Sequence, residues 1–175
     1  MALTPIWPLR IRLIHWAVAL ACILNFKFLE DGETPHRFVG YGAAALVLIR
    51  VLLGLIHSQP EIRIQGMVGS LQQIPTELAK LASKQRPSLS RGHSPLAAPV
   101  MLLIWVLVLA LGVSGWMMGL DTFFGSETLE EIHELFSHAL QVLILAHLAG
   151  IAHEAWSHRT PAWMGMIHGK KKTQD

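Results

Sequence analysis

The sequence predicts an all-α integral membrane protein, built as a bundle of four transmembrane helices, and three observations lead to this class. Hydrophobic residues make up 52% of the 175 residues and charged residues only 15%, whereas an ordinary soluble domain is about 25% charged. Four stretches are apolar over roughly the 20 residues that a helix needs to cross the hydrocarbon core. Lysine and arginine gather in alternate connections, which is typical of multi-pass membrane proteins. At this length we expect a single domain, covering residues 1–175.

The first three spans are long apolar runs, expected at about 9–29, 37–57 and 97–120. No small-residue cleavage site follows the first run, so we expect a retained helix and not a signal peptide. Residues 58–96, between the second and third spans, mix Gly, Pro, Ser and charged residues and are expected to form a loop. Within it, the stretch LQQIPTELAKLA has the spacing of a short amphipathic helix that lies on the membrane surface.

The fourth span, expected at about 129–157, is long enough to cross a membrane but is rich in histidine. Five histidines lie between Glu131 and His158. Ionisable residues are uncommon inside a bilayer and usually face the interior of the bundle, where they pair or have a functional role. For any single histidine, the alternative is an ordinary hydrogen bond between helices.

The basic residues predict the orientation. All of the 14 Lys and Arg residues except Lys27 and Arg37 belong to the first segment, the end of the second span, the 58–96 loop or the last segment. Because the basic side is normally cytoplasmic, we expect a multi-pass membrane protein with both termini and this loop in the cytoplasm. A basic excess on one membrane face does not indicate nucleic-acid binding, and none is expected.

The spacing of two histidines in the fourth span predicts two separate sites. His133 and His147 are 14 residues apart, which is within about 40° of four whole helical turns and corresponds to a rise of about 21 Å. Both side chains are therefore expected to face the bundle interior at different depths, too far apart for one mononuclear metal. His138 and His153 lie off this face of the helix.

Each of these two histidines has a partner at a matching depth. His15 lies near the cytoplasmic start of the first span, level with His147. His36 opens the second span on the outer side, level with His133. The topology thus predicts an inner pair, His15 with His147, and an outer pair, His36 with His133.

Two imidazoles per site favour haem iron over zinc as the metal. Structural zinc sites need four protein ligands and catalytic ones three, whereas two histidines fill both axial positions of a haem iron. Such a haem has no open coordination position, so it carries electrons and does not bind oxygen. Cys22 is the only cysteine, which excludes an intrachain disulfide and a CxxCH motif for covalent haem attachment. We therefore expect two non-covalent haems.

Two arginines are candidate partners of the haem propionates. Arg50 lies 14 residues after His36, so it is expected on the same helix face at the depth of the inner haem. Arg12 precedes His15 by three residues, on the same side of the first span. The alternative for either arginine is a side chain that extends to the cytoplasmic surface.

Five motifs follow one another along nearly the whole chain: RLIHW, PHRFVGYGAAALVLIRVLLG, GHSPL, EIHELFSHALQVLILAHLAGIAHE and GMIHGKKK. With them the chain resembles the bacterial cytochrome b561 proteins and the related b-type cytochrome subunits of membrane hydrogenases. The resemblance implies a multi-pass protein of the bacterial inner membrane with four membrane helices and two haem b groups, ligated by His15 with His147 and by His36 with His133. Ser94 stands where the family motif GHNP has Asn, which leaves the expected ligands unchanged.

Transmembrane electron transfer is the function that these features predict, between membrane quinone and a periplasmic redox partner such as a c-type cytochrome or a dehydrogenase. One alternative is a haem-bearing membrane-anchor subunit of a periplasmic dehydrogenase or hydrogenase, which would copurify with a larger enzyme. An alternative from another class is a His-lined proton or metal transporter, which would be colourless. Quinone oxidoreductase activity and a homodimer both stay open at this stage.

Overall fold

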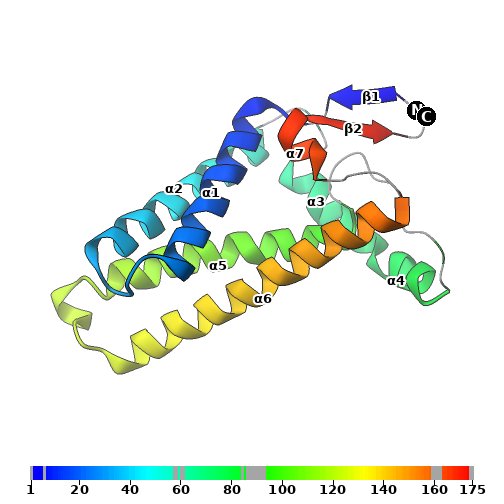
Figure 1. The fold of residues 1–175 in the computed structure, drawn as a ribbon. Coiled ribbons are helices and arrows are strands. Elements are labelled where there is room, and N and C mark those ends of the chain that lie inside the picture. Colours follow the sequence, from blue (N-terminus) through cyan, green and yellow to red (C-terminus); the bar gives the residue numbers. More distant parts are fainter. Residues whose placement is uncertain are drawn as a thin grey trace. The chain divides into compact units, whose positions relative to one another are not determined.

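The computed structural model describes residues 2–5, 7–56, 59, 62–83, 85, 94–158 and 163–173. Four long helices dominate it (Figure 1): α1 (Leu9–Lys27), α2 (Thr34–Ile56), α5 (Ala97–Met117) and α6 (Glu127–His158). By length and composition, all four are able to cross a membrane. The predicted all-α class with four membrane-spanning helices is therefore confirmed.

The helix ends differ from the predicted span ends by a few residues, for local reasons. Helix α2 begins at Thr34, before the predicted 37, because a proline such as Pro35 fits the first helical turn. Helix α5 ends at Met117 and is followed by the short 3-10 helix η2 (Asp121–Phe123). Helix α6 begins at Glu127, where acidic side chains in the first turn favour the positive end of the helix dipole.

The predicted surface helix at LQQIPTELAKLA is divided in the structure. Helix α3 (Ile64–Ser70) precedes it, residues Leu71–Gln73 form the 3-10 helix η1, and only Ile74–Ala82 form the α-helix α4. A proline inside the first turn is compatible with a helix that starts at Ile74 and not with one that runs through it.

The chain forms two compact units. Each long helix contributes one end to each unit, because the unit boundaries fall within all four helices. The first unit comprises Met1–Arg12, Val51–Leu102 and Leu145–Asp175, and the second unit comprises Leu13–Arg50 and Leu103–Ile144.

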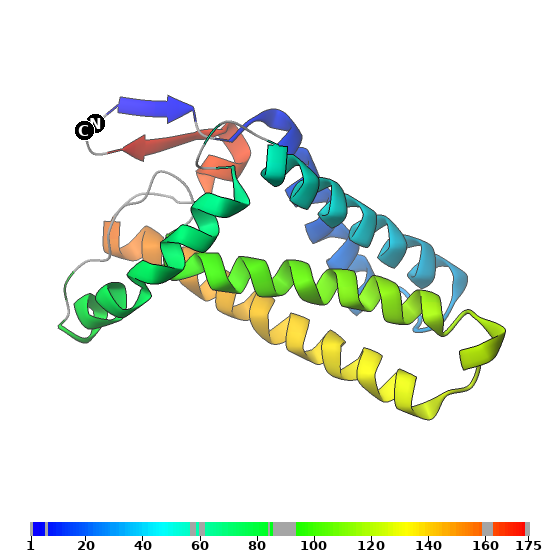
Figure 2. The same ribbon diagram turned by 180° about the vertical axis from the view of Figure 1, so that it is seen from behind.

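The first unit contains a small two-stranded sheet that the sequence did not predict. Strands β1 (Ala2–Pro5) and β2 (Lys170–Thr173) pair antiparallel and lie side by side in Figures 1 and 2, with Pro5 opposite Lys170. Strand β2 follows helix α7 (Met164–His168) after a left-handed turn at Gly169, whose φ is 74°. Each strand has four residues, and so short a sheet does not change the all-α class.

A cluster of buried side chains holds the first unit together. Trp7, Ile11 and Ile62 form its centre, and Leu53 and Met166 pack against them. The Trp7 amide also donates a hydrogen bond to the Gly169 carbonyl at 3.2 Å. This unit thus combines a buried apolar cluster with backbone pairing of its terminal segments.

The second unit buries apolar side chains such as Val47 and Leu140, and it also shows close approach of helix backbones. A Cβ atom placed on Gly112 of α5 would lie 2.5 Å from the Cβ atom of Ala44 on α2, so only glycine fits this contact. A Cβ on Gly40 of α2 would lie 3.3 Å from the side-chain nitrogen of Asn25 on α1. Close packing at small residues is typical of membrane helices, where burial of apolar surface against lipid gives little driving force.

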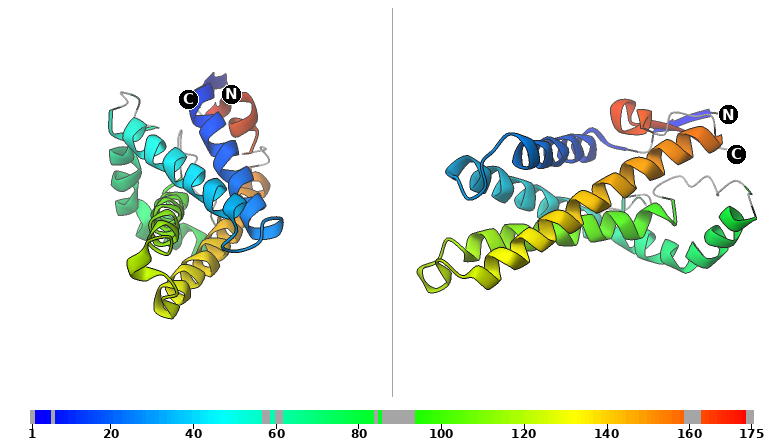
Figure 3. Two further views of the ribbon diagram at one scale, coloured as in Figure 1. Left: turned by 90° about the vertical axis from the view of Figure 1, so that its left-hand side faces the viewer. Right: turned by 60° about the horizontal axis from the view of Figure 1, so that its bottom comes forward.

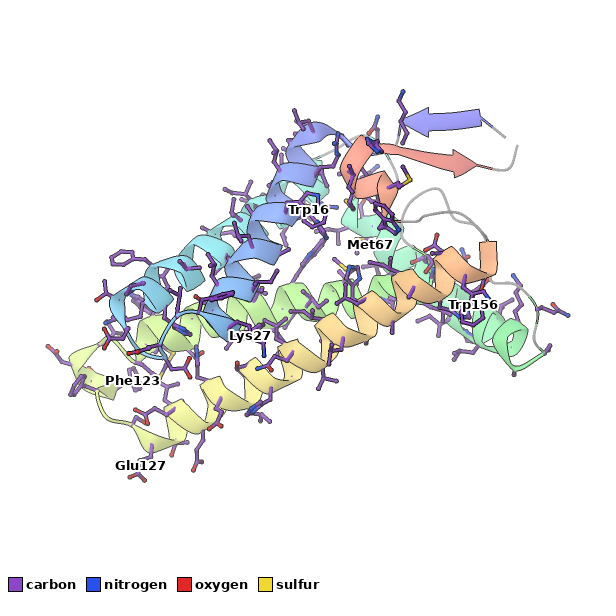
Figure 4. All side chains as sticks on the ribbon, in the orientation of Figure 1. Trp16, Lys27, Met67, Phe123, Glu127 and Trp156 are labelled. Carbon is purple, nitrogen blue, oxygen red and sulfur yellow. The ribbon has the colours of Figure 1, made fainter. Side chains whose placement is uncertain are left out.

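Large apolar side chains cover the outside of the second unit. They remain exposed on all four helices, as expected for surfaces that face lipid tails. Figure 3 shows the connection between α5 and α6 from two further sides, and Figure 4 labels Phe123 in it and Glu127 at the start of α6. This connection carries Asp121, and the one between α1 and α2 carries Glu30, Asp31 and Glu33.

Candidate functional site

The structure brings His36 and His133 together within the second unit. His36 lies in the first turn of α2 and His133 in the second turn of α6. The centres of their imidazole rings are 6.5 Å apart, and the ring planes are inclined by 57°. The His36 side chain is 19% exposed, so the pair is largely enclosed by the helices.

This separation fits two axial ligands of one metal. With a metal–nitrogen bond of about 2 Å and a ring centre about 1 Å beyond the nitrogen, two imidazoles on opposite sides of one iron have centres roughly 6 Å apart. Two neutral histidines are also the donor set that bis-histidine haem requires.

The second nitrogen of His133 is held by a hydroxyl group. The Ser114 Oγ atom, on α5, lies 2.8 Å from His133 Nδ1. The same hydroxyl donates to the Leu111 carbonyl at 3.3 Å. With Nδ1 engaged, Nε2 is the nitrogen left for a metal, which is the arrangement that ligating histidines usually show.

The second nitrogen of His36 faces an acidic side chain instead. His36 Nδ1 lies 3.5 Å from the Asp31 Oδ1 atom, and among the described residues no hydrogen bond reaches it. The Asp31 side chain is 95% exposed, so water screens this contact and weakens it. The two ligand candidates therefore have different surroundings, a buried hydroxyl for one and a solvated carboxylate for the other.

His15 and His147 belong to different units, so each is described by itself. His15, in the second unit, meets the ring of Trp16 edge to face with centres 5.2 Å apart; Trp16 is labelled on α1 in Figure 4. His147, in the first unit, is half-buried on α6. Their predicted pairing stays a prediction.

Arg50 is one of the few buried charged residues in the described part of the chain. It is only 5% exposed, and its guanidinium carbon lies 4.9 Å from the centre of the Trp105 ring, also in the second unit. A cation over an indole face is a favourable arrangement that partly replaces hydration.

Arg12 makes structural contacts in the first unit. Its Nε atom donates to the Met166 carbonyl at 3.2 Å, and its Nη2 atom donates to the Ile167 carbonyl. These carbonyls end α7, where a positive charge and donors to the last carbonyls stabilise a helix. A second role toward a haem propionate stays a prediction.

The remaining histidines are less enclosed. His138, His153 and His168 are exposed, and His153 Nε2 lies 3.4 Å from the Ser157 hydroxyl. His57, His93 and the side chain of His158 lie outside the described residues. Within the described part of the chain, no three His, Cys, Asp or Glu side chains form a cluster able to hold a metal ion.

Sequence reasoning missed Ser114 and Asp31. Ser114 carries the only hydroxyl group between residues 97 and 117, and an isolated polar group inside a span tends to find a partner on another helix. That signal was available, although it does not say which helix holds the partner. Asp31 has no comparable signal, because several acidic residues share its loop.

Comparison with known proteins adds one finding. A family model described as prokaryotic cytochrome b561 matches residues 6–169. No curated protein and no solved structure matches the chain.

Proposed function

The chain belongs to the prokaryotic cytochrome b561 family, and from this premise we propose that it passes electrons between membrane quinone and a periplasmic redox partner through two haems. Membership makes the chain a b-type haem protein of the inner membrane with an electron-transfer role. The number of haems, their ligands and the partners are our proposal.

The His36–His133 pair is the observation that carries the proposal. The two rings stand 6.5 Å apart, on two different helices, with Nδ1 of each turned toward an oxygen atom. These residues would hold the outer haem through their Nε2 atoms. When bound, haem supplies a one-electron couple between ferric and ferrous iron.

The inner haem is assigned to His15 and His147. His147 follows His133 by 14 residues on α6, so it lies on nearly the same helix face, at the level proposed for the inner haem. His15 is the histidine of α1, and it follows the basic residues of the first segment, which we expect at the cytoplasmic surface. The protein's part is to fix both ligand pairs, keep their imidazoles neutral and set the charge around each haem.

The proposed orientation places both termini in the cytoplasm. The acidic loops then face the periplasm beside the outer haem, where they suit a redox partner that carries a positive patch. A c-type cytochrome or a dehydrogenase fits this description. Quinone is the proposed partner within the membrane.

Haem content and redox titration test the proposal. We expect a pyridine haemochrome assay of haem-saturated protein to give two non-covalent haems per chain, and the reduced-minus-oxidised spectrum to titrate as two low-spin components. His138→Leu is the matched control, because His138 is exposed on the same helix and is expected to leave both components in place. A stoichiometry of one haem per chain contradicts the proposal.

An anchor subunit is distinguished by turnover. If the purified protein oxidises or reduces a quinol analogue alone, it acts as a quinone oxidoreductase. Activity that appears only after a larger dehydrogenase copurifies identifies an anchor subunit instead.

A further inference from the structure

A buried hydroxyl on α5 contacts the His133 ligand, although α5 carries no histidine. Ser114 is only 5% exposed. Its Oγ atom lies 2.8 Å from His133 Nδ1 and 3.3 Å from the Leu111 carbonyl oxygen.

The number of protons decides the direction of these hydrogen bonds. A serine hydroxyl has one proton and two acceptor lone pairs. A carbonyl oxygen only accepts, so both contacts are hydrogen bonds when the single proton of Ser114 goes to Leu111. The Ser114 oxygen then accepts from Nδ1–H of His133, which leaves Nε2 unprotonated.

We propose that Ser114 is the positioning residue of the outer haem: it fixes the tautomer and the ring plane of His133 and makes this ligand more basic. The inference rests on the proposed function, which assigns His133 as a ligand.

Contacts on both sides of Ser114 hold its hydroxyl in place. Gly112 packs against Ala44 of α2, with room for hydrogen only. One residue after Ser114, the Gly115 carbonyl accepts a hydrogen bond from the Tyr41 hydroxyl of α2 at 3.2 Å. This part of α5 is therefore fixed to the helix that carries His36 while it holds the histidine of α6.

A Cβ on Gly115 would lie 3.5 Å from His133 Cε1, so this edge of the ring packs against the α5 backbone at Gly115. The ring of His133 thus has one hydrogen bond and one packing surface, both from α5. Together they leave little freedom for rotation of the ring about its bond to Cβ.

The hydrogen bond has a predictable effect on redox potential. A histidine that donates from its second nitrogen is a more basic ligand, and a more basic ligand favours ferric over ferrous iron. Ser114 should therefore lower the potential of the outer haem, and its removal should raise it.

The experiment compares Ser114→Ala with Ser114→Thr, each combined with His15→Leu so that only the outer haem is expected to remain. Val113→Ala in the same background is the matched control, because Val113 is the neighbouring residue and is 56% exposed. The readouts are the midpoint potential and the low-spin electron paramagnetic resonance signal of the ferric haem.

For Ser114→Ala we expect the ratio of reduced to oxidised haem at a fixed potential to rise about fivefold, an upward shift of about 40 mV at 59 mV per tenfold. We also expect a broadened or displaced resonance signal, since the ring plane is no longer fixed. Ser114→Thr keeps a hydroxyl and should restore both readouts toward the parent, and Val113→Ala should change neither.

The outcomes separate this inference from the proposed function. If Ser114→Ala keeps its haem with an unchanged potential and an unchanged resonance signal, the inference is wrong and the haem assignment stands. If the His15→Leu parent already lacks every haem component, the assignment itself fails. Should Ser114→Thr lose haem, the comparison of Ser114→Ala with Val113→Ala still decides the question.

Discussion

The two units of this protein are stabilised in different ways. The first unit buries Trp7 against aliphatic side chains and pairs its terminal segments as strands. The second unit relies on close helix contacts at Gly112 and Gly40 and on a hydrogen bond to a histidine. The comparison shows that both units bury apolar side chains, such as Val47 and Leu140 in the second unit, and that close backbone approach and a polar contact between helices are added in the unit that holds His36 and His133.

Two arginines that the sequence predicts as partners of haem propionates lie in different units and make different contacts. Arg12, in the first unit, donates to backbone carbonyls at the end of α7. Arg50, in the second unit, is buried over an indole ring. Variants of the two arginines, and of the histidines they would accompany, test which of them also affects a haem.

The largest expected effect is the loss of a whole redox component. His36→Leu and His133→Leu should each remove the outer haem, and His15→Leu and His147→Leu the inner one. Potentiometric titration of the four variants should therefore show one missing component, the same within each pair. Deletion of the same component by His15→Leu and His133→Leu contradicts the pairing.

The next effect tests the close helix contact in the second unit. Gly112→Ala adds a Cβ atom 2.5 Å from the Cβ of Ala44, and overpacking of this kind costs about 1–3 kcal/mol. We expect a lower thermal midpoint of haem release in detergent, recovered by Ala44→Gly in the double variant.

Gly42→Ala is the control for this contact. Nothing lies within 4 Å of a Cβ at Gly42, and replacing a helical glycine by alanine removes backbone freedom from the unfolded chain. The midpoint should therefore stay the same or rise slightly. A fall equal to that of Gly112→Ala means that the contact with Ala44 is not the cause.

Arg50→Leu should lower the midpoint potential of the inner haem. A positive charge near a haem favours the ferrous form, which carries one positive charge fewer, so loss of that charge favours the ferric form. The expected change is on the order of 1.4 kcal/mol, and Arg50→Lys should recover part of it. A shift confined to the outer component would falsify the placement of Arg50 at the inner haem.

The smallest effect is expected for Arg12→Leu, which removes two hydrogen bonds to the end of α7. A net loss of about 1 kcal/mol per bond should appear as faster proteolysis of the C-terminal segment, with both haem potentials unchanged. Arg12→Lys keeps the charge but not the forked geometry. If Arg12→Lys restores a potential that Arg12→Leu shifts, Arg12 acts on a propionate after all.

Much of the fold was predictable because membrane spans have a strong signal. Apolar length located α1, α2, α5 and α6 to within a few residues of their ends. The strands were not predictable, since KKKT and ALTP have no alternation of apolar and polar residues. Their pairing depends on tertiary contacts between segments at opposite ends of the chain.

The candidate site was likewise predictable only in part. The topology of the spans predicted that His36 and His133 lie at one level, and the structure places their rings near each other. Spacing along one helix says nothing about a contact from a different helix, so the role of Ser114 had to come from the structure. Ser94 is a smaller case: its hydroxyl accepts a hydrogen bond from the Ala97 amide at 3.2 Å at the start of α5, a role that Asn fills as well.

Haem content of the His36→Leu/His133→Leu double variant tests the central claim most directly, namely that these two histidines hold one and the same haem. If they do, either single substitution already removes that haem, and combining the two substitutions removes nothing more. We predict one haem per chain in the pyridine haemochrome assay, equal to each single variant and half the wild-type value. A double variant that has lost both haems while each single variant keeps one contradicts the account.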